Sequence, residues 1–217
     1  MTDASGKKPP TSAAARDVPR GAPLYVMGYV FFTLWIRLVY GLRIAGAEHV
    51  PRAGGCIIAS NHFSGWDPPV VGVAAAPRQV HFMAKRELFA KPFLAWVLRA
   101  VRAFPVDRTA NDIGAVKEAL RRLKAGHTVG IFFEGTRHAD AKAVMGGAAF
   151  LAQRAAVPIV PAAIWREGRR FRVVFGPPLR PEGTSKEEAL ALTADLAQRV
   201  REMLAQGQEP REERASR

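Results

Sequence analysis

The stretch CIIASNHFSGWDPP, residues 56–69, runs from a short apolar segment through a polar turn into a pair of prolines. The residues CIIAS, 56–60, favour a buried strand, which would place His62 at the carboxyl end of that strand. Asp67 followed by Pro68 is typical of a helix start, with aspartate as the N-cap and proline at the first helical position. The stretch therefore predicts a strand, a turn and a helix in succession.

Short apolar runs recur after Gly46, and helical patterns separate them. This alternation predicts an α/β fold, in which helices cover a mixed sheet. The expected strands cover residues 56–60, 80–84, 103–107, 128–133, 158–164 and 172–176. One helix is expected over 111–126 with Gly126 as its stop, and another from Ser185 to about Ala205, opened by a capping box.

Charge narrows the range of partners. The 217 residues include 32 Lys and Arg against 19 Asp and Glu, which gives a formal net charge of +13. Such a protein attracts polyanions: nucleic acid, an anionic membrane surface or a phosphorylated small molecule. Because the short signatures of nucleic-acid-binding modules are lacking, we expect no nucleic-acid partner. The single cysteine, Cys56, excludes an intrachain disulfide and is expected to be buried packing.

Both ends of the chain differ from its middle. Residues 1–22 and 206–217 are rich in small and charged residues without an apolar period, and we expect both to be disordered. Residues 23–45 open with the apolar run PLYVMGYVFFTLWI, which Arg37 and Arg43 follow. The run is short for a spanning helix and favours a helical, membrane-associating segment that lies in the bilayer interface. An ordinary core helix, a signal peptide and a true span are the alternatives.

His62 and Asp67 suggest a catalytic pair. Carboxyl ends of strands are where open α/β sheets usually build their sites. An Asp67 carboxylate held at a helix start can also accept a hydrogen bond from the ring N–H of His62, which would fix the tautomer and make the histidine a general base. A helix cap without catalysis is the simpler interpretation of this pair taken alone.

A second polar turn follows the apolar run that ends at Phe133. It consists of Glu134, Gly135, Thr136 and Arg137. Glycine permits close approach of a ligand to the backbone, and an arginine fork with a hydroxyl suits the oxygens of a phosphate monoester. A turn with a surface ion pair is the alternative. Two polar turns at strand ends of one sheet can face the same crevice.

Four blocks of sequence, taken in order, carry a resemblance to a known family. They are NHFSGWD (61–67), KRELFAKPFLAWVLRAVRAFPVDR (85–108), FFEGTRH (132–138) and VPIVPAAI (157–164). They resemble the 1-acylglycerol-3-phosphate (lysophosphatidic acid) acyltransferases over about residues 48–178. The resemblance implies a glycerolipid acyltransferase-like catalytic domain over 46–205. Such an enzyme transfers a fatty acyl group from acyl-CoA or acyl carrier protein to a lysophospholipid acceptor, giving phosphatidic acid, and uses no metal or cofactor.

The resemblance also implies roles for single residues. His62 would be the general base and Asp67 its orienting carboxylate, with direct attack of the lipid hydroxyl on the thioester. Residues implied to bind the acceptor's phosphate and glycerol are Glu134, Gly135, Thr136 and Arg137, with Lys85 and Arg108 adding to the anionic pocket. Pro158 and Pro161 of the fourth block would shape the acyl-binding wall.

The chain departs from the family pattern in ways that bear on the acceptor. The unusual residues are Phe133, His138, Ala95, Met145, Gly146 and Arg102, the last expected on an exposed helix surface. Alternatives are another lysolipid or glycolipid acceptor, or a non-catalytic relative that binds anionic lipid. A serine acyl-enzyme through Ser64 is disfavoured because no G-x-S-x-G elbow is present. We expect a peripheral or monotopic protein on the cytoplasmic face of the cell membrane, and the oligomeric state stays open.

Overall fold

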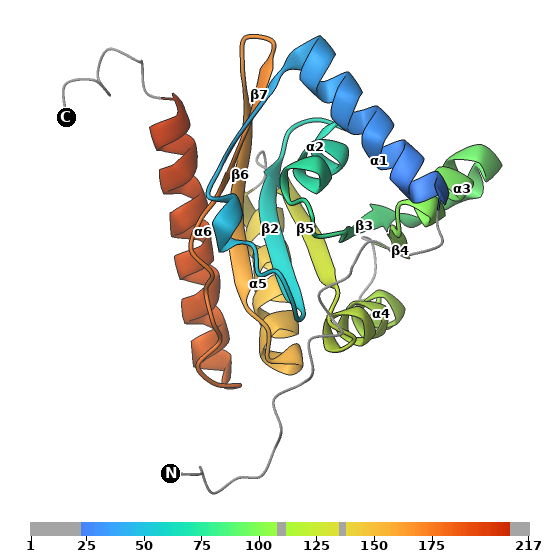
Figure 1. Cartoon of the computed structure of the whole chain (residues 1–217). Helices are drawn as coiled ribbons and strands as arrows, with labels where there is room; N and C mark the ends of the chain where they lie inside the picture. The colour runs from blue at the N-terminus through green and yellow to red at the C-terminus, as the bar shows by residue number, and fades with distance from the viewer. Residues whose placement is uncertain (1–22, 108–111, 135–137, 209–217) are drawn as a thin grey trace, which may run out of the picture.

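A single mixed sheet organises the protein (Figure 1). The computed structural model describes residues 23–107, 112–134 and 138–208. The strands are β1 (Leu42–Ala45), β2 (Cys56–His62), β3 (Val80–Lys85), β4 (Phe104–Val106), β5 (Thr128–Glu134), β6 (Ile159–Glu167) and β7 (Arg170–Phe175). Their order is β1-β7-β6-β2-β5-β3-β4. The strands from β6 to β4 in this order run parallel, and the β7 and β1 pair runs the opposite way.

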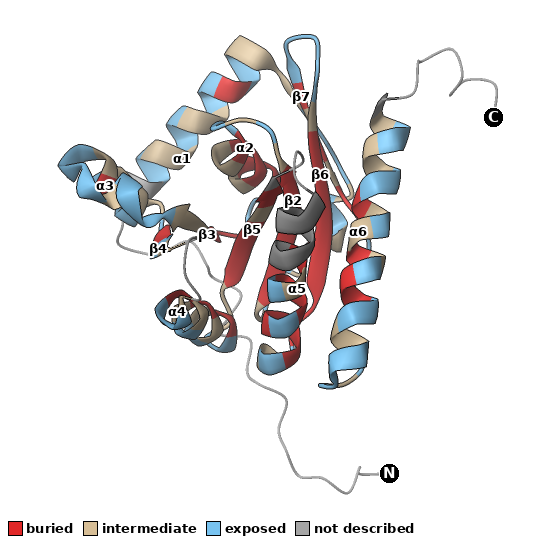
Figure 2. Ribbon diagram, turned by 180° about the vertical axis from the view of Figure 1, so that it is seen from behind, coloured by how far each residue is buried: buried red, intermediate tan, exposed pale blue. Residues whose placement is uncertain are grey.

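Helices cover both faces of this sheet (Figures 1 and 2). The α-helices are α1 (Pro23–Trp35), α2 (Asp67–Ala74), α3 (Pro92–Ala100), α4 (Ile113–Lys124), α5 (His138–Ala155) and α6 (Lys186–Gln208). Shorter helical turns are η2 (Ile36–Tyr40), η3 (Ala47–His49) and η4 (Arg86–Ala90). Helices α4, α5 and α6 pack on one face, while α1 and α2 lie on the other.

Within the described part of the chain, we find no helix with both the length and the apolar character that a bilayer crossing requires.

The core has two apolar layers, one on each face of the sheet. Successive residues of β2 show the division: Ile57 joins the layer under α4, α5 and α6, whereas Ile58 joins the layer under α1 and α2. Both side chains are at most 1% exposed, as expected for a central parallel strand that is covered on both faces. Figure 2 shows β2, β5 and β6 as the buried centre of the molecule.

The strands and two helices expected from the sequence are present, and two expectations are corrected. Helix α6 continues to Gln208, so residues 206–208 are helical rather than part of the tail expected to be disordered. The helical segment predicted for residues 23–45 ends at Tyr40, and residues 42–45 form β1 instead. Gly41, with φ +77°, breaks the helix. The chain then pairs with β7, where Leu42 lies opposite Phe171. The last residues of that segment therefore belong to the sheet.

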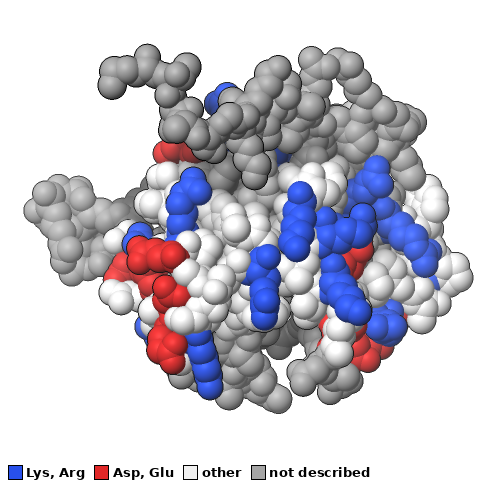
Figure 3. Space-filling view, turned by 90° about the horizontal axis from the view of Figure 1, so that it is seen from below, with Lys and Arg blue, Asp and Glu red and all other residues white. Residues whose placement is uncertain are grey.

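Positive charge is spread over more than one face. Figure 3 shows the lower face of the molecule, at the amino ends of the parallel strands, where several separate Lys and Arg side chains lie among uncharged residues. Exposed basic residues placed there by the topology are Arg52 before β2, Lys124 before β5 and Arg180 after β7. This face lies opposite the strand ends that carry His62, so net charge alone does not locate the site.

Candidate active site

The loop between β2 and α2 joins His62 to Asp67. Asp67 is fully buried, and its Oδ2 lies 2.7 Å from His62 Nδ1. The same oxygen accepts hydrogen bonds from the backbone N–H groups of Phe63 at 2.7 Å and Ser64 at 2.8 Å. Because a carboxylate accepts, the Nδ1 of the neutral imidazole carries the proton and Nε2 keeps its lone pair. The pair has the geometry of an orienting carboxylate and a base.

The helix-cap interpretation of Asp67 is wrong in its main point. Asp67 is the first residue of α2 and Trp66 is the N-cap, and no side chain caps the helix there. The carboxylate turns back onto its own loop instead, and its other oxygen, Oδ1, finds no hydrogen-bond partner among the described residues. Pro68 is the second residue of α2 rather than the first, as the start at Asp67 shifts the expected position by one. Asp67 therefore holds the loop and the histidine rather than the helix end.

Ser64 has a structural part in this loop. Its hydroxyl accepts a hydrogen bond from the backbone N–H of Trp66 at 3.2 Å. Among the described residues, His62 has no hydrogen bond to Ser64, since Nδ1 is committed to Asp67. The pairing that a serine nucleophile would need is not formed.

Strand register brings the two polar turns together. β2 and β5 are neighbours, and His62 and Glu134 are Cα partners at the ends of these parallel strands. Gly135, Thr136 and Arg137 lie outside the described residues, as does Arg108. Lys85 ends β3, on the other side of β5, and is exposed. The structure thus collects His62, Asp67, Lys85 and the main chain of Glu134 at one edge of the sheet.

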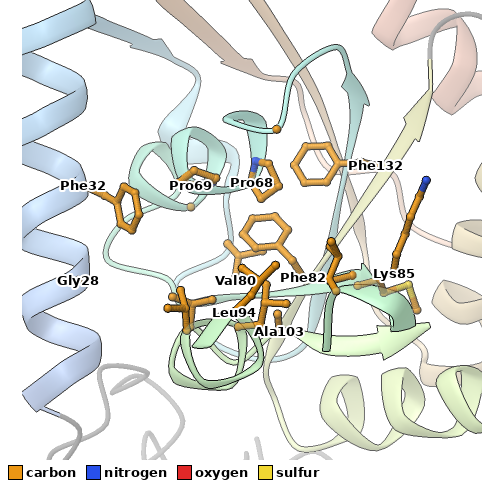
Figure 4. A pocket seen from close by; sticks show the side chains of 18 of the residues that line it. Gly28, Phe32, Pro68, Pro69, Val80, Phe82, Lys85, Leu94, Ala103 and Phe132 are labelled. Atoms are coloured by element: carbon orange, nitrogen blue, oxygen red, sulfur yellow. The ribbon is translucent and has the colours of Figure 1, made fainter. Parts of the chain in front are cut away.

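An apolar pocket begins at this edge and extends beneath α1 (Figure 4). Its volume is about 480 Å³. The walls come from α1, α2, β3, α3 and β5, with Phe32, Pro69, Phe82, Leu94 and Phe132 among the lining residues. His62 and Lys85 also line it, and the His62 ring lies 5.0 Å from that of Phe132, centroid to centroid. The proposed base therefore stands beside a space that suits a hydrocarbon chain.

The two prolines expected to shape an acyl-binding wall lie away from this pocket. Pro158 and Pro161 are not among the residues that line this pocket. Pro161 pairs in register with Ala59, whose side chain belongs to the layer under α4, α5 and α6. Side chains alternate along a strand and paired residues share a face, so Pro161 points away from the pocket. Helices α1, α2 and α3, with β3 and β5, line the pocket itself.

Three of the departures from the family pattern are buried residues. Phe133 and Met145 are 5% and 7% exposed and pack in the layer under α4, α5 and α6. Arg102 is not on a helix surface, because α3 ends at Ala100 and Arg102 has a left-handed φ of +62° in the turn that follows. It is nevertheless exposed, as expected. Ala95 is buried in α3.

Sequence reasoning missed Asn61. Its side chain is buried, donates to the carbonyl of Ile164 and accepts from the N–H of the same residue, both at 2.8 Å. The signal available was a polar residue directly after an apolar strand and directly before His62. The apolar wall supplied by α3 was also missed.

His81 and Asp112 are among the ionisable groups whose pKa values are strongly shifted. Burial, followed by the positive charge of Arg122, lowers the pKa of His81 to about 3. Hydrogen bonds from the backbone N–H groups of Asp107 and Ala115 lower the pKa of Asp112 to about 2. His81 is therefore neutral at physiological pH, and Asp112 is an ionised N-cap that fixes the start of α4.

The fold and the site define an α/β protein with a histidine–carboxylate pair at the rim of an apolar pocket. The model of the acyltransferase family matches residues 41–165. This match spans more than half of the chain. The chain therefore belongs to the acyltransferase family.

Two relatives and one solved structure are similar to this chain. A 1-acyl-sn-glycerol-3-phosphate acyltransferase of Bacillus subtilis (strain 168) is 35% identical over 177 residues, which cover 75% of this chain and 88% of the relative. One from Streptococcus pneumoniae is 34% identical over 139 residues, 63% of this chain and 52% of that protein. The crystal structure of the 1-acyl-sn-glycerophosphate (LPA) acyltransferase PlsC from Thermotoga maritima matches with a TM-score of 0.65 and 25% identity, covering 87% of this chain and 79% of that one.

Proposed function

We propose that this protein transfers a fatty acyl group from an acyl thioester to the free hydroxyl of 1-acylglycerol-3-phosphate and so makes phosphatidic acid. The names of its relatives support the acceptor and product. The observation that carries the proposal is the 2.7 Å contact between His62 Nδ1 and Asp67 Oδ2 beside the apolar pocket. A base beside a hydrocarbon-sized space is what acyl transfer to a lipid hydroxyl needs.

The chemistry follows from the tautomer. Nε2 of His62 takes the proton of the acceptor hydroxyl while its oxygen attacks the thioester carbonyl. The tetrahedral intermediate collapses, the carbon–sulfur bond breaks, and the imidazolium returns the proton to the leaving thiolate. Asp67, buried and already bonded to Nδ1, stabilises the imidazolium that exists between these two events. No acyl-enzyme is formed.

We assign the acyl chain and the acceptor phosphate to different parts of the pocket. The space lined by Phe32, Phe82 and Leu94 receives an acyl chain, and burial of each methylene contributes about 0.8 kcal/mol of binding. Lys85, at the same edge, adds positive charge near the acceptor phosphate. The remaining proposed ligands of phosphate and glycerol are Glu134, Gly135, Thr136, Arg137 and Arg108. The donor is acyl-CoA or acyl carrier protein, and no metal or cofactor takes part.

The outer surface near the pocket suits an interfacial enzyme. Exposed apolar side chains gather on α1, among them Met27 and Phe31, which are 66% and 58% exposed. On α3, Phe93 is 77% and Trp96 is 52% exposed. Aromatic and aliphatic side chains of this kind bury favourably at a bilayer surface. We therefore place the protein on the cytoplasmic face of the membrane as a peripheral or monotopic enzyme, with α1 as the membrane-associating helix and residues 46–205 as the catalytic domain.

The test is thiol release from a long-chain acyl-CoA by the purified protein, with and without lysophosphatidic acid. We expect release that depends on the acceptor and falls about 100-fold or more in His62→Ala, the usual contribution of a general base. Ser64→Ala is the matched control in the same loop. It keeps the backbone N–H that bonds Asp67 and should retain turnover within about tenfold of the parent.

Two results would reject the proposal. If His62→Ala leaves thiol release unchanged, His62 is not the base. If Ser64→Ala loses as much activity as His62→Ala, the result points to an acyl-enzyme. If acyl-CoA gives no release, acyl carrier protein thioesters are assayed with the same acceptor. Failure with both donors would exclude lysophosphatidic acid as the acceptor and leave another lysolipid, a glycolipid or lipid binding without turnover.

A further inference from the structure

We propose that the hairpin joining β6 to β7 is a binding surface for anionic lipid headgroups. We call residues 166–170 the arginine hairpin. It carries Arg166, Arg169 and Arg170, all exposed, together with Glu167 and Gly168. This inference rests on the proposed function, because it assumes that the enzyme works at a membrane, and it names the lipid class and the residues that hold the enzyme there.

Arg166 is held in place by aromatic rings. Its guanidinium lies over the ring of Tyr40 at 5.4 Å and over that of Phe171 at 5.3 Å from the respective centroids. Stacking on ring faces orients a guanidinium while its in-plane N–H groups stay available for an anion. An arginine fixed in this way loses less side-chain entropy when it binds a phosphate than a free one does. Arg166 is thus a preorganised cation on the surface.

Arg169 and Arg170 add positive charge that no carboxylate of the described residues neutralises. Arg169 Nη2 reaches the carbonyl of Val39 at 3.5 Å, and Arg170 packs across Gly41. Among the described residues, neither Arg169, Arg170 nor Arg166 pairs with a carboxylate. Glu167, the acidic residue of the hairpin, is bound by Arg172. The tip therefore presents three positive charges to solvent.

The neighbourhood of the hairpin favours a lipid over other polyanions. In Figure 1 the tip of the hairpin and the carboxyl end of α1 project at the same edge of the molecule. Trp35, the last residue of α1, is 41% exposed, and Leu38, in the η2 turn that follows, is 81% exposed. Basic residues beside exposed apolar ones match the headgroup and acyl layers of an anionic bilayer, whereas a nucleic acid offers no apolar layer.

The same residues adjoin the catalytic loop. Tyr40, beneath Arg166, lies 6.1 Å from the ring of Trp66, and Phe171 lies 6.5 Å from that of Phe63. Phe63 and Trp66 belong to the loop that carries His62 and Asp67. A headgroup bound at the arginine hairpin therefore sits next to the rim of the active site, where an acceptor leaves or enters the bilayer.

The experiment compares two variants of equal net charge in sedimentation with vesicles. One carries Arg166→Gln, Arg169→Gln and Arg170→Gln, and the matched control carries Arg52→Gln, Lys124→Gln and Arg180→Gln on the opposite face. Vesicles are pure phosphatidylcholine or phosphatidylcholine with phosphatidylglycerol. A third variant, Arg169→Gln with Arg170→Gln, keeps the Arg166 stack in case its loss impairs folding.

We expect the hairpin variant to lose about tenfold or more in affinity for anionic vesicles, given the free energy that each basic residue contributes near an anionic surface. Removing only Arg169 and Arg170 should give part of this loss. The opposite-face variant and binding to pure phosphatidylcholine should change little. Equal loss in the hairpin and opposite-face variants would overturn the proposal, because binding would then follow net charge alone. So would parental binding by the hairpin variant, or a loss of duplex DNA binding without a loss of vesicle binding.

Turnover with detergent-dispersed lysophosphatidic acid separates this proposal from the one on which it rests. The hairpin variant should match the parent in detergent, where no anionic surface is needed, and fall below it on anionic vesicles. A hairpin variant as slow in detergent as on vesicles would assign these arginines to the reaction and reject the headgroup role. Vesicle binding lost as predicted in a protein without any turnover would reject the reaction and leave the arginine hairpin standing.

Discussion

The side chain of Asn61 forms hydrogen bonds with both main-chain polar groups of Ile164. The β2–β6 register ends at Ser60 and Ala162, and the Asn61 side chain continues it by donating to the Ile164 carbonyl and accepting from the Ile164 N–H. The next residue along β2 is His62. His62, the proposed base, is thus carried by a strand end that is fixed to β6 from one side and paired with β5 from the other.

Replacing this amide tests the connection. Asn61→Ala leaves a buried N–H and a buried carbonyl without partners, which we expect to cost about 2–4 kcal/mol in the free energy of unfolding. Urea denaturation measures the loss. Gln198→Ala, which removes an exposed amide bound to Glu202, is the control and should change stability by less than about 0.5 kcal/mol. If Asn61→Ala were as harmless as the control, the pair of bonds would have no role in holding the strand end.

Asp67→Asn tests the carboxylate as a charge rather than as an anchor. The amide oxygen can still accept from the loop N–H groups, so the fold should survive, but a neutral group stabilises the imidazolium poorly. We expect kcat to fall about 100-fold or more while KM for the acceptor changes little. Steady-state kinetics on protein with unchanged far-UV circular dichroism provides the measurement. A variant with the parental kcat would show that the charge of Asp67 is dispensable.

Gly72 offers a way to shorten the pocket. A Cβ added there would lie 3.5 Å from the Phe82 ring, an ordinary contact, so a larger side chain enters the lined space without a backbone clash. Gly72→Leu should raise the ratio of kcat/KM for short over long acyl thioesters at least about tenfold, since each excluded methylene forfeits about 0.8 kcal/mol. Gly146→Leu adds the same side chain on α5, where its Cβ meets open space, and should leave the ratio unchanged. An unaltered chain-length profile in Gly72→Leu would mean that the acyl chain lies elsewhere.

His81 predicts a particular sensitivity to acid. Its pKa is about 3 in the folded protein against an ordinary 6.5, so between these values the unfolded chain binds a proton that the folded protein does not. Stability should therefore fall as the pH falls below about 6.5, by about 1.4 kcal/mol between about pH 7.5 and about pH 5.5 from this group. His81→Gln should lose that part of the pH dependence. Urea denaturation at the two pH values measures the free energy of unfolding of parent and variant. An identical pH dependence in both would show that the pKa of His81 is not lowered by burial.

Much of the fold could be predicted because its signals are local. The runs that became β2, β5 and β6 are apolar, rich in β-branched residues and bounded by turn residues, and central parallel strands have that composition. β1 was missed because Leu42 and Ile44 are too few to show a period and follow an apolar helix directly. Its pairing with β7 depends on residues far away in the sequence, which no local pattern reports.

For the candidate site, the sequence pointed to residues but not to their geometry. His62 and Asp67 were chosen from their spacing and from family resemblance, and the structure brings them into contact. The direction of the Asp67 carboxylate could not be predicted, since a cap and a loop anchor use the same residue at the same position. Asn61 escaped because its partner is the backbone of a strand about a hundred residues away, and backbone partners leave no trace in side-chain patterns.

The short connection between α1 and β1 links the position of α1 to the position of the candidate active site. Only residues 36–41 separate the exposed helix from a strand that is hydrogen-bonded into the sheet. If α1 binds at a bilayer surface, as proposed, this short connection fixes the distance between that surface and His62. On that proposal, glycines inserted after Tyr40 would leave the enzyme bound to the bilayer but would no longer fix the distance between the bilayer and His62.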